Sequence, residues 1–381
     1  MPKIIHDSEV RWGVIGAGDV CRKKSAPAMN KIPRSRMVAV MRRNGEKARE
    51  YAMAHNVPNW YDDADKLLAD PEVNTVYIAT PPDAHLELTR KAAAAGKPVY
   101  VEKPMARTHR ECMEMIEVCK QAGVPLFVAY YRRMLPNYRK IMELVENDTI
   151  GEVRHVQIRL NKAVNPDVDT DPGNWRVDPD QAGGGYFYDL ASHQLDFLDY
   201  LLGSIVETRG FSANQAGLYK AEDIVTGSFR FESGVLGTGS WCFTSGRRSE
   251  VDEIVITGSR GEISYPTFEG YHVDLAVDGY MEKRMIDELD KDGDREKASE
   301  TSKRGSAGKI AHYRDAEGRE PLRFRFEIPE HIQQPLIETI VGQLLGEKEG
   351  DGRSVICPST GVTAARTNLV MEQLCNAENL I

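Results

Sequence analysis

Three side chains of this 381-residue chain could together move a proton: the ammonium of Lys103, the carboxylate of Asp189 and the imidazole of His193. Lys103 lies between an acid and a proline in Glu102-Lys103-Pro104, where the end of an expected strand would point its side chain from a rigid edge. Partial burial or a neighbouring positive charge would lower the pKa of this lysine, which suits proton transfer. The alternative is a surface lysine paired with Glu102.

Asp189 and His193 follow three consecutive glycines and lie on a helix expected over residues 186–202. Together with Asp196 and Tyr200 they fall at positions i, i+4, i+7 and i+11, which places them in one polar stripe. Such a stripe on a solvated helix usually has no function. The flanking sequence is not charged, however, and this favours a buried, functional stripe over a solvated one.

The chain begins with a strand, a glycine turn and a helix, the context typical of a dinucleotide site. A strand expected over 11–15 leads into Gly16, Ala17, Gly18, Asp19, Val20 and Cys21. Gly16 permits the tight turn, Gly18 lets the backbone approach a pyrophosphate, and the helix N-terminus adds donors. Cys21 replaces the third glycine of the usual fingerprint and is small enough for close helix packing. An ordinary tight turn is the alternative.

The next expected strand, 36–41, ends in Arg42 and Arg43. A site for NAD would place an acidic residue here to bind the 2′-hydroxyl of the ribose, whereas an arginine can pair with a 2′-phosphate. We therefore expect NADP in preference to NAD, with Arg42 as the leading contact. A solvated strand end is the alternative.

Helices and strands then alternate as far as residue 129. Helices are expected over 46–55, 62–69, 85–95 and 110–122, and strands over 75–79, 99–101 and 126–129. This alternation predicts a parallel sheet with helices on both faces, whose ligands bind at the carboxyl ends of the strands. The residues expected at these ends are Thr80, Pro81, His85, Glu102 and Lys103 for the cofactor and Tyr130 for the substrate.

The second half of the chain is rich in strands. Strands are expected over 153–161, 205–212, 224–231, 235–243, 253–257, 262–265 and 323–328, and helices over 331–345 and 361–374. The segment 287–319 is dense in charge and poor in apolar residues, so we expect an exposed loop there.

Composition narrows the class of protein. The length predicts two domains, and 41% hydrophobic and 28% charged residues are typical of a soluble globular protein. A net charge of −9 without a long basic run argues against a nucleic-acid partner. Six cysteines show neither CxxC nor metal-ligand spacing, so no metal is expected, and Cys112 and Cys119 are expected to be buried free thiols. The absence of a signal core and of a long apolar run predicts a cytoplasmic protein that binds no membrane.

Four motifs together resemble the Gfo/Idh/MocA oxidoreductases, in the same order and spacing over nearly the whole chain. They are Gly16-Ala17-Gly18, Ala79-Thr80-Pro81-Pro82, Glu102-Lys103-Pro104 and the stretch 183–193. The resemblance implies an α/β fold with a Rossmann domain over 1–129 and an α/β domain with an open, mainly antiparallel sheet over 130–381. The C-terminal helix would be able to pack back on the first domain. The face of the open sheet commonly makes oligomer contacts in the family, which implies a homodimer or homotetramer.

The resemblance also implies residue roles. Lys103 matches the lysine placed near the nicotinamide and the substrate oxygen, and Asp189 and His193 match the family's aspartate and histidine, with His193 as general acid/base. Departures from the family are Cys21, the Arg42-Arg43 strand end and the charged segment. None of these departures changes the three catalytic positions. What the departures leave open is the choice of cofactor and of substrate.

Trp175 and Arg176 lie in a loop that the resemblance places near the active site. The indole could stack on a sugar face and the guanidinium could hold a substrate hydroxyl or carboxylate, although an ordinary loop anchor is an equal alternative. Tyr186 and Tyr188 are similar candidates. The substrate-binding set is Tyr130, Trp175, Arg176, Tyr188 and His193.

We therefore expect an oxidoreductase that uses NADP, with NAD possible, and acts on a small polyol, sugar or keto-sugar derivative. Two alternatives stay open. One is redox-neutral glycoside cleavage with a tightly bound nicotinamide, and the other is a nucleotide-sensing regulator without turnover. An intact acid/base set argues against the regulator.

Overall fold

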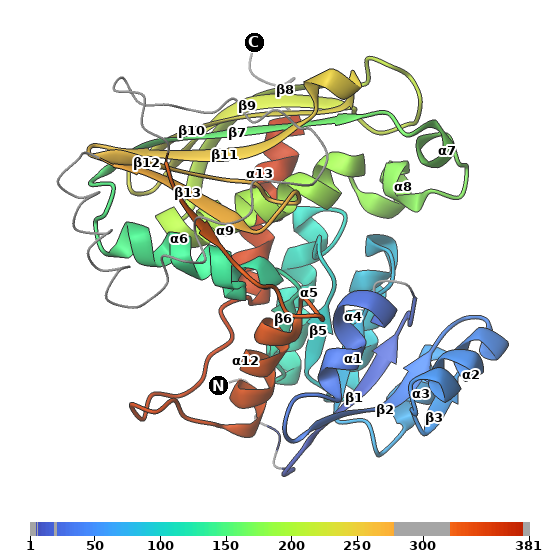
Figure 1. The fold of residues 1–381 in the computed structure, drawn as a ribbon. Coiled ribbons are helices and arrows are strands. Elements are labelled where there is room, and N and C mark those ends of the chain that lie inside the picture. The colour runs from blue at the N-terminus through green and yellow to red at the C-terminus, as the bar shows by residue number, and fades with distance from the viewer. Residues whose placement is uncertain (1–4, 6, 19–20, 278–320, 376–381) are drawn as a thin grey trace. The chain divides into compact units, whose positions relative to one another are not determined.

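The computed structural model describes residues 5, 7–18, 21–277 and 321–375 (Figure 1). The charged segment 287–319, as well as Asp19 and Val20 of the glycine stretch, lies outside the described residues. The chain divides into two compact units, of which the first comprises 1–134, 175–192 and 329–372, and the second the remaining residues. The domain boundary expected after residue 129 stays a prediction.

Unit 1 is built on a parallel six-stranded sheet in the order β3-β2-β1-β4-β5-β6. Its strands are β1 (Val10–Ile15), β2 (Ser35–Met41), β3 (Asn59–Tyr61), β4 (Thr75–Ile78), β5 (Val99–Val101) and β6 (Leu126–Val128). The expected parallel sheet is therefore confirmed. The edge strand β3 was not expected, because three residues are too short to show an alternating pattern.

Five α-helices connect these strands: α1 (Ala26–Met29), α2 (Gly45–Ala54), α3 (Ala64–Ala69), α4 (His85–Ala94) and α5 (His109–Ala122). Local chemistry sets the ends of α5, since the Thr108 hydroxyl accepts the backbone N–H of Glu111 at 3.1 Å and Gly123 ends the helix with a φ of 67°. The helix expected after the glycine turn is present in two parts. A π-helical turn, Cys21–Ser25, precedes the short α1. Pro27 lies in the first turn of α1, where its missing N–H costs no hydrogen bond within the helix.

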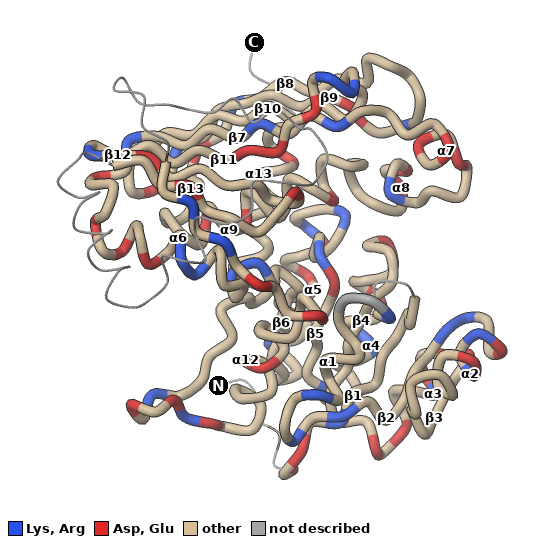
Figure 2. The backbone as a smooth tube through the Cα atoms, in the orientation of Figure 1, with Lys and Arg blue, Asp and Glu red and all other residues tan. Residues whose placement is uncertain are grey.

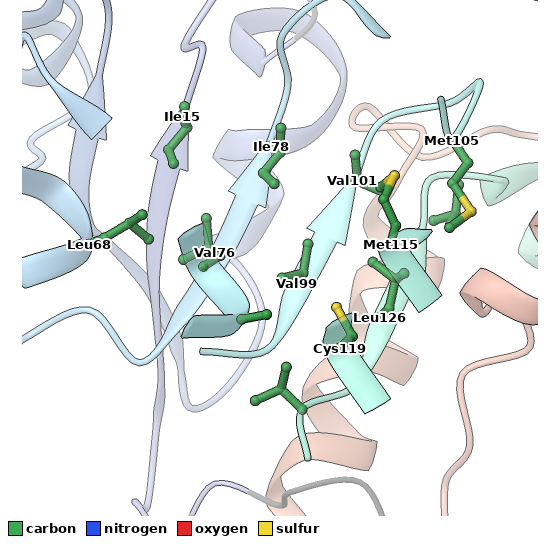
Figure 3. Packing of buried hydrophobic residues seen from close by; sticks show 14 of the residues in the cluster. Ile15, Leu68, Val76, Ile78, Val99, Val101, Met105, Met115, Cys119 and Leu126 are labelled. Carbon is green, nitrogen blue, oxygen red and sulfur yellow. The ribbon is translucent and has the colours of Figure 1, made fainter. Parts of the chain in front are cut away.

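The hydrophobic core of unit 1 lies against one face of this sheet. Alternate residues of β4 and β5 point into it, together with Ile15 of β1 (Figure 3). The core residues labelled on these two strands are Val76, Ile78, Val99 and Val101. Cys112 and Cys119 of α5 belong to the same cluster as free, buried thiols, as expected. Burial raises the pKa of Cys119 to about 12, so this thiol stays protonated near neutral pH.

The opposite face of the sheet carries aromatic residues. Trp12, Tyr77 and Tyr100 are fully buried, and the rings of Tyr77 and Tyr100 stack at 4.8 Å between centroids. Helix α12 (Gln334–Leu345) contacts β1 and α1. The C-terminal segment also reaches β6, where the backbone N–H of Val128 donates to the carbonyl of Ser359 at 3.2 Å.

Unit 2 is built on an eight-stranded sheet in the order β14-β13-β12-β11-β7-β10-β9-β8. Its strands are β7 (Val153–Ala163), β8 (Ile205–Ala213), β9 (Ile224–Phe231), β10 (Leu236–Ser245), β11 (Val251–Gly258), β12 (Gly261–Tyr265), β13 (His272–Val277) and β14 (Leu322–Arg325). All neighbouring pairs are antiparallel except β10 and β7. The fold class is therefore confirmed as a Rossmann domain with a second α/β domain of mainly antiparallel sheet.

Besides α12, the α-helices that the structure describes outside the Rossmann alternation are α6 (Pro136–Glu146), α7 (Pro166–Asp169), α8 (Pro179–Ala182), α9 (Ser192–Leu202) and α13 (Gly361–Cys375). Helix α6 was not expected, although Pro136 at its first position and the buried Tyr138, Ile141 and Leu144 give a clear helical pattern. No helix within the described residues is long and apolar enough to cross a membrane. Lys and Arg segments are interspersed with Asp and Glu segments along the tube in Figure 2.

Candidate functional site

The glycine turn lies between the ends of three strands of unit 1. The backbone N–H of Gly16 donates to the carbonyl of Met41 at 3.0 Å, which joins the turn to the end of β2. Gly16 has a φ of 86°, and a Cβ built on it would lie 2.8 Å from Cγ2 of Thr80, just past the end of β4. A side chain at position 16 would therefore be both strained and blocked.

This turn fits the pyrophosphate of a dinucleotide on two observations. Among the described residues, a Cβ on Gly18 would meet nothing nearer than the Gly16 carbonyl oxygen at 3.7 Å, so they leave the backbone open on that side. The buried Thr80 hydroxyl has no hydrogen-bond partner among the described residues, although buried polar groups are normally paired. Both features match a site whose ligand supplies the missing contacts.

Cys21 occupies the position of the third glycine as a packed thiol. It is fully buried, and its Sγ lies 3.7 Å from the carbonyl oxygen of Gly16. Burial raises the pKa of Cys21 to about 12, so the side chain is a neutral thiol near neutral pH. The replacement therefore adds no charge beside the glycine turn.

Two arginines follow β2. The backbone N–H of Arg42 donates to the carbonyl of Tyr61 at 3.1 Å, its side chain is half-buried, and Arg43 is exposed. Neither guanidinium forms an ion pair with any residue that the structure describes. The next residue, Asn44, caps α2 by accepting the backbone N–H of Lys47 at 3.0 Å. The carboxyl end of β2 therefore carries two positive charges that no described carboxylate neutralises.

Pro81 and His85 shape the loop after β4. Pro81 precedes a short 3₁₀ turn, Pro82–Ala84, which leads directly into α4. The fully buried ring of His85 lies 2.9 Å (Nε2) from the carbonyl oxygen of Thr80 and 3.0 Å (Nδ1) from that of Met105. Desolvation on burial lowers the pKa of His85, which favours the neutral imidazole. His85 thus links the loops that follow β4 and β5.

Glu102 is a buried carboxylate with three hydrogen-bond donors. Its Oε1 accepts the hydroxyl of Tyr77 at 2.5 Å and the amide of Gln333 at 2.7 Å. Its Oε2 accepts the backbone N–H of Lys103 at 3.2 Å. Burying a charge is costly unless hydrogen bonds or an opposite charge compensate it, and these donors supply that compensation.

The Lys103 ammonium forms an ion pair with the carboxylate of Asp189 and donates to its backbone carbonyl at 2.9 Å. The two side chains are 12% and 22% exposed, so the pair is largely removed from water. Lys103 is therefore not the surface lysine paired with Glu102 that the sequence left as an alternative. It reaches instead to a residue 86 positions later in the chain.

Arg176 approaches the other oxygen of the same carboxylate, with its Nε 3.5 Å from Oδ2 of Asp189. Its guanidinium carbon also lies 4.5 Å from the centre of the Trp175 ring, within the range of a cation–π contact. One carboxylate therefore lies between two cations, all within unit 1. This arrangement fixes the Lys103 ammonium on one oxygen of the Asp189 carboxylate and brings Arg176 to the other.

The helix expected over 186–202 begins differently from the prediction. Residues Phe187–Ala191 form a π-helical turn, and only then does the α-helix α9 begin. Such turns are rare in proteins as a whole, but those that occur are often found at functional sites. Gly184 makes room for it, because a Cβ there would lie 2.2 Å from the ring of Tyr188. The buried Tyr188 and the half-buried Asp189 both belong to this turn.

The predicted residues beyond this turn belong to unit 2. His193 is buried in α9, and its ring centre lies 6.0 Å from that of Phe268. Asp196 is also buried, and Tyr200 is half-buried. Tyr130, in unit 1, is buried immediately after β6, and its backbone N–H donates to the carbonyl of Val128 at 2.8 Å. The predicted stripe is therefore largely buried rather than solvated.

Sequence reasoning missed Tyr77 and Gln333, which hold Glu102. Tyr77 carried a weak signal, because it is the single polar-tipped residue in an otherwise apolar strand end and faces the same side as Tyr100. Gln333 carried none, since an uncharged amide just before a helix is common and lies 231 positions from Glu102.

Comparisons with known proteins agree with this fold. The family "Oxidoreductase family, NAD-binding Rossmann fold" (GFO_IDH_MocA) matches residues 10–130, and the "GFO/IDH/MocA C-terminal domain" matches residues 138–264. Oxidoreductase P35 of Formosa agariphila is 32% identical over 370 residues, which cover 97% of this chain and 99% of that protein.

Two further proteins are similar. Myo-inositol 2-dehydrogenase of Thermotoga maritima is 30% identical over 67% of this chain and 74% of its own length. A levoglucosan dehydrogenase solved with NADH and levoglucosan shares the fold, with a TM-score of 0.75 at 20% identity over 97% of both chains. The two family matches, together with a relative similar over nearly its whole length, show that this chain is an NAD(P)-dependent oxidoreductase of the Gfo/Idh/MocA family.

Proposed function

We propose that this enzyme transfers a hydride between NADP and a CH–OH group of a sugar, polyol or keto-sugar derivative. The observation that carries the proposal is the Lys103–Asp189 ion pair, which lies next to β5 of a Rossmann sheet. Ligands of such sheets bind at the carboxyl ends of the strands, and this is where Lys103 lies. Two similar proteins support this substrate class. One is named myo-inositol 2-dehydrogenase, and the other is a levoglucosan dehydrogenase solved with NADH and levoglucosan.

The bound cofactor supplies a hydride acceptor in the oxidising direction and a hydride donor in the reducing direction. In the oxidising direction His193 accepts the hydroxyl proton of the substrate, and Lys103 polarises the substrate oxygen through its ammonium. Asp189 holds that ammonium in place by the ion pair and by its backbone carbonyl. In the reducing direction the same groups return a proton to the forming alkoxide.

We assign the cofactor to the residues at the strand ends. The backbone at Gly16, Ala17 and Gly18, and the hydroxyl of Thr80, would hold the pyrophosphate. Arg42 and Arg43 would hold a 2′-phosphate, and their lack of a carboxylate partner within the described part of the chain supports NADP over NAD.

The substrate would be held by aromatic and basic side chains. Trp175 presents its ring beside the Arg176 guanidinium, which suits the apolar face and the hydroxyls of a sugar. Tyr130 and Tyr188 supply further hydroxyl groups.

The first test asks whether nicotinamide stays with the purified protein. After exhaustive gel filtration, we expect the denatured supernatant to show little nicotinamide absorbance, and the protein to bind added NADPH and oxidise it with keto-sugars. Retained cofactor, together with release of an aglycone from glycosides and no net redox change, would contradict the proposal and support redox-neutral cleavage.

The second test separates turnover from binding. We expect Lys103→Met and His193→Ala to lower kcat by about 10² to 10⁴-fold while the Kd for NADPH changes by less than about threefold. Lys91→Met is a matched control, because Lys91 is exposed and pairs with Asp65 on the surface. Unchanged turnover in either variant, with binding retained, would refute the catalytic assignment.

We also propose a homodimer or homotetramer formed through the sheet of unit 2. Three large apolar side chains are exposed on its strands: Val206 (52%), Phe211 (81%) and Leu236 (56%). Exposed apolar surface of this kind often marks an interface between proteins. Light scattering should show that Phe211→Glu shifts the oligomer towards the monomer, whereas an unchanged mass would contradict this interface.

A further inference from the structure

A chain of hydrogen bonds runs through unit 1 and includes Glu102, the carboxylate that accepts the backbone N–H of Lys103. It joins Ser25, Tyr77, Glu102, Gln333 and Tyr100 over distances of 2.5 to 2.9 Å. All five residues are buried, and Glu102, the most exposed, is only 8% accessible. They come from the turn before α1, from β4, from both the interior and the end of β5, and from the segment before α12. Four separate parts of unit 1 are therefore joined by one chain of hydrogen bonds, whose central member is the Glu102 carboxylate.

The chemistry of these groups fixes the direction of each hydrogen bond. Tyr77 has one hydroxyl proton and donates it to Glu102, so Ser25 must donate to Tyr77. Tyr100 donates to Oε1 of Gln333, which leaves the Nε2 of that amide facing Glu102. Because an ionised carboxylate can only accept, Gln333 acts on Glu102 as a donor, and Tyr100 supports this orientation of the amide by donating to its Oε1.

We propose that Gln333 is a positioning residue for the active site. It holds the Glu102 carboxylate, which in turn accepts the backbone N–H of Lys103 and so fixes the peptide from which the Lys103 ammonium extends to Asp189. Glu102 Oε1 is occupied by two donors, so Oε2 is the oxygen with a lone pair left for the cofactor. The expected change in kcat rests on the proposed function, whereas the expected change in the Kd for NADP does not require turnover of a sugar or polyol.

The titratable groups around Glu102 leave this arrangement unchanged near neutral pH. The negative charge of Glu102 contributes to raising the pKa values of four neighbours, which are Cys21, Tyr77, His85 and Tyr100. Burial raises the pKa of both tyrosines well above the usual value, so they stay protonated donors. Burial also raises the pKa of Cys21 to about 12 and lowers that of His85, so both stay neutral. Lys103 is the positive group that follows Glu102 in the chain, and its ammonium is paired with Asp189.

The variant Gln333→Glu tests the proposal by making the same hydrogen bond dependent on pH. A protonated glutamic acid has the shape of glutamine and can donate to Glu102 while accepting from Tyr100. Once that proton is lost, two carboxylates face each other in a buried site and repel. Gln334→Glu is the matched control, because Gln334 is the next residue and its amide bonds to Glu338 on the surface.

We would measure kcat, KM and the Kd for NADP of both variants and of the wild type between pH 6 and pH 9, and their unfolding temperatures. We expect Gln333→Glu to approach the wild type at pH 6 and to lose about tenfold or more in kcat and in NADP affinity by pH 9. The wild type and Gln334→Glu should lack this additional titration. Tyr100→Phe, which removes the bond that orients the amide, should weaken NADP binding at every pH.

Two results would overturn the proposal. The first is a Gln333→Glu protein whose kcat and Kd follow the wild type at every pH. The second is a variant whose unfolding temperature alone changes with pH, since that would show a merely structural role. If the wild type turns over no sugar or polyol, the proposed function fails, but the pH dependence of NADP binding still decides the role of Gln333.

Discussion

Replacing Arg42 by alanine should remove most of the preference for NADP. The guanidinium follows β2, is half-buried and has no carboxylate partner among the described residues, so nothing in that part of the chain competes with a bound phosphate. A hydrogen bond to a charged group contributes about 1.5 to 3 kcal/mol. Because Arg42 is partly in water, we take the lower end, which corresponds to about a tenfold change in Kd.

The assay is a titration of each protein with NADPH and with NADH, followed by energy transfer from tryptophan to the reduced nicotinamide. The ratio of the two Kd values is the informative quantity, because any general damage to the fold weakens both cofactors equally. We expect Arg42→Ala to lower the preference for NADPH about tenfold, and less in high salt because ions screen the charge. Arg42→Glu should favour NADH, since a carboxylate repels the 2′-phosphate and accepts the ribose hydroxyl.

The control is Arg49→Ala, which removes one exposed positive charge from α2 without touching the end of β2. If this variant shifted the ratio as much as Arg42→Ala does, a general electrostatic effect would explain the preference. If Arg42→Ala left the ratio within about twofold of the wild type, the assignment of the 2′-phosphate to this strand end would be refuted.

Three further predictions concern stability. Gly16→Ala should lower the free energy of unfolding by at least about 1 kcal/mol and weaken NADPH binding, because the new Cβ would lie 2.8 Å from Thr80; wild-type values for both would contradict this geometry. The pKa of His85 is lowered below its usual 6.5 by burial, so the unfolded chain binds a proton first as the pH falls below that value. The free energy of unfolding should then decrease by up to about 1.4 kcal/mol per pH unit. Denaturant titrations of His85→Gln should show a shallower decrease with falling pH than those of the wild type, and an equal slope would contradict this prediction. Asp252→Ala should cost about 1.5 to 3 kcal/mol, because the carboxylate accepts three backbone N–H groups of the loop that carries Phe268, and thermal unfolding at the wild-type temperature would rule this out.

Much of the first unit could be predicted because its determinants are local. The turn at Gly16 needs a positive φ, and the strands that follow are short apolar runs bounded by turn residues, both of which can be read directly from sequence. The elements that were not expected include β3 in unit 1 and both α6 and β13 in unit 2. Strand β3 is too short to show a period, whereas α6 has a clear helical period.

The candidate site was only partly predictable for a different reason. The motifs located Lys103 and Asp189, but their ion pair joins residues far apart in the chain and depends on the π-helical turn at 187–191. The partners of Glu102 were invisible, because Gln333 reaches it only after the C-terminal segment folds back onto unit 1. Patterns in sequence report local periodicity, and neither contact is local.

The most direct test of the central claim is a transfer experiment with NADPH in which both hydrogens at C4 of the nicotinamide are replaced by deuterium, so that transfer from either face of the ring carries the label. The enzyme would be incubated with this cofactor and a panel of keto-sugars, and the products analysed by mass spectrometry and NMR. We predict one deuterium on the new carbinol carbon for each NADPH oxidised, with none lost to water, and a rate of transfer lowered by about 10² to 10⁴-fold in Lys103→Met. Product formation without deuterium at that carbon would contradict direct hydride transfer.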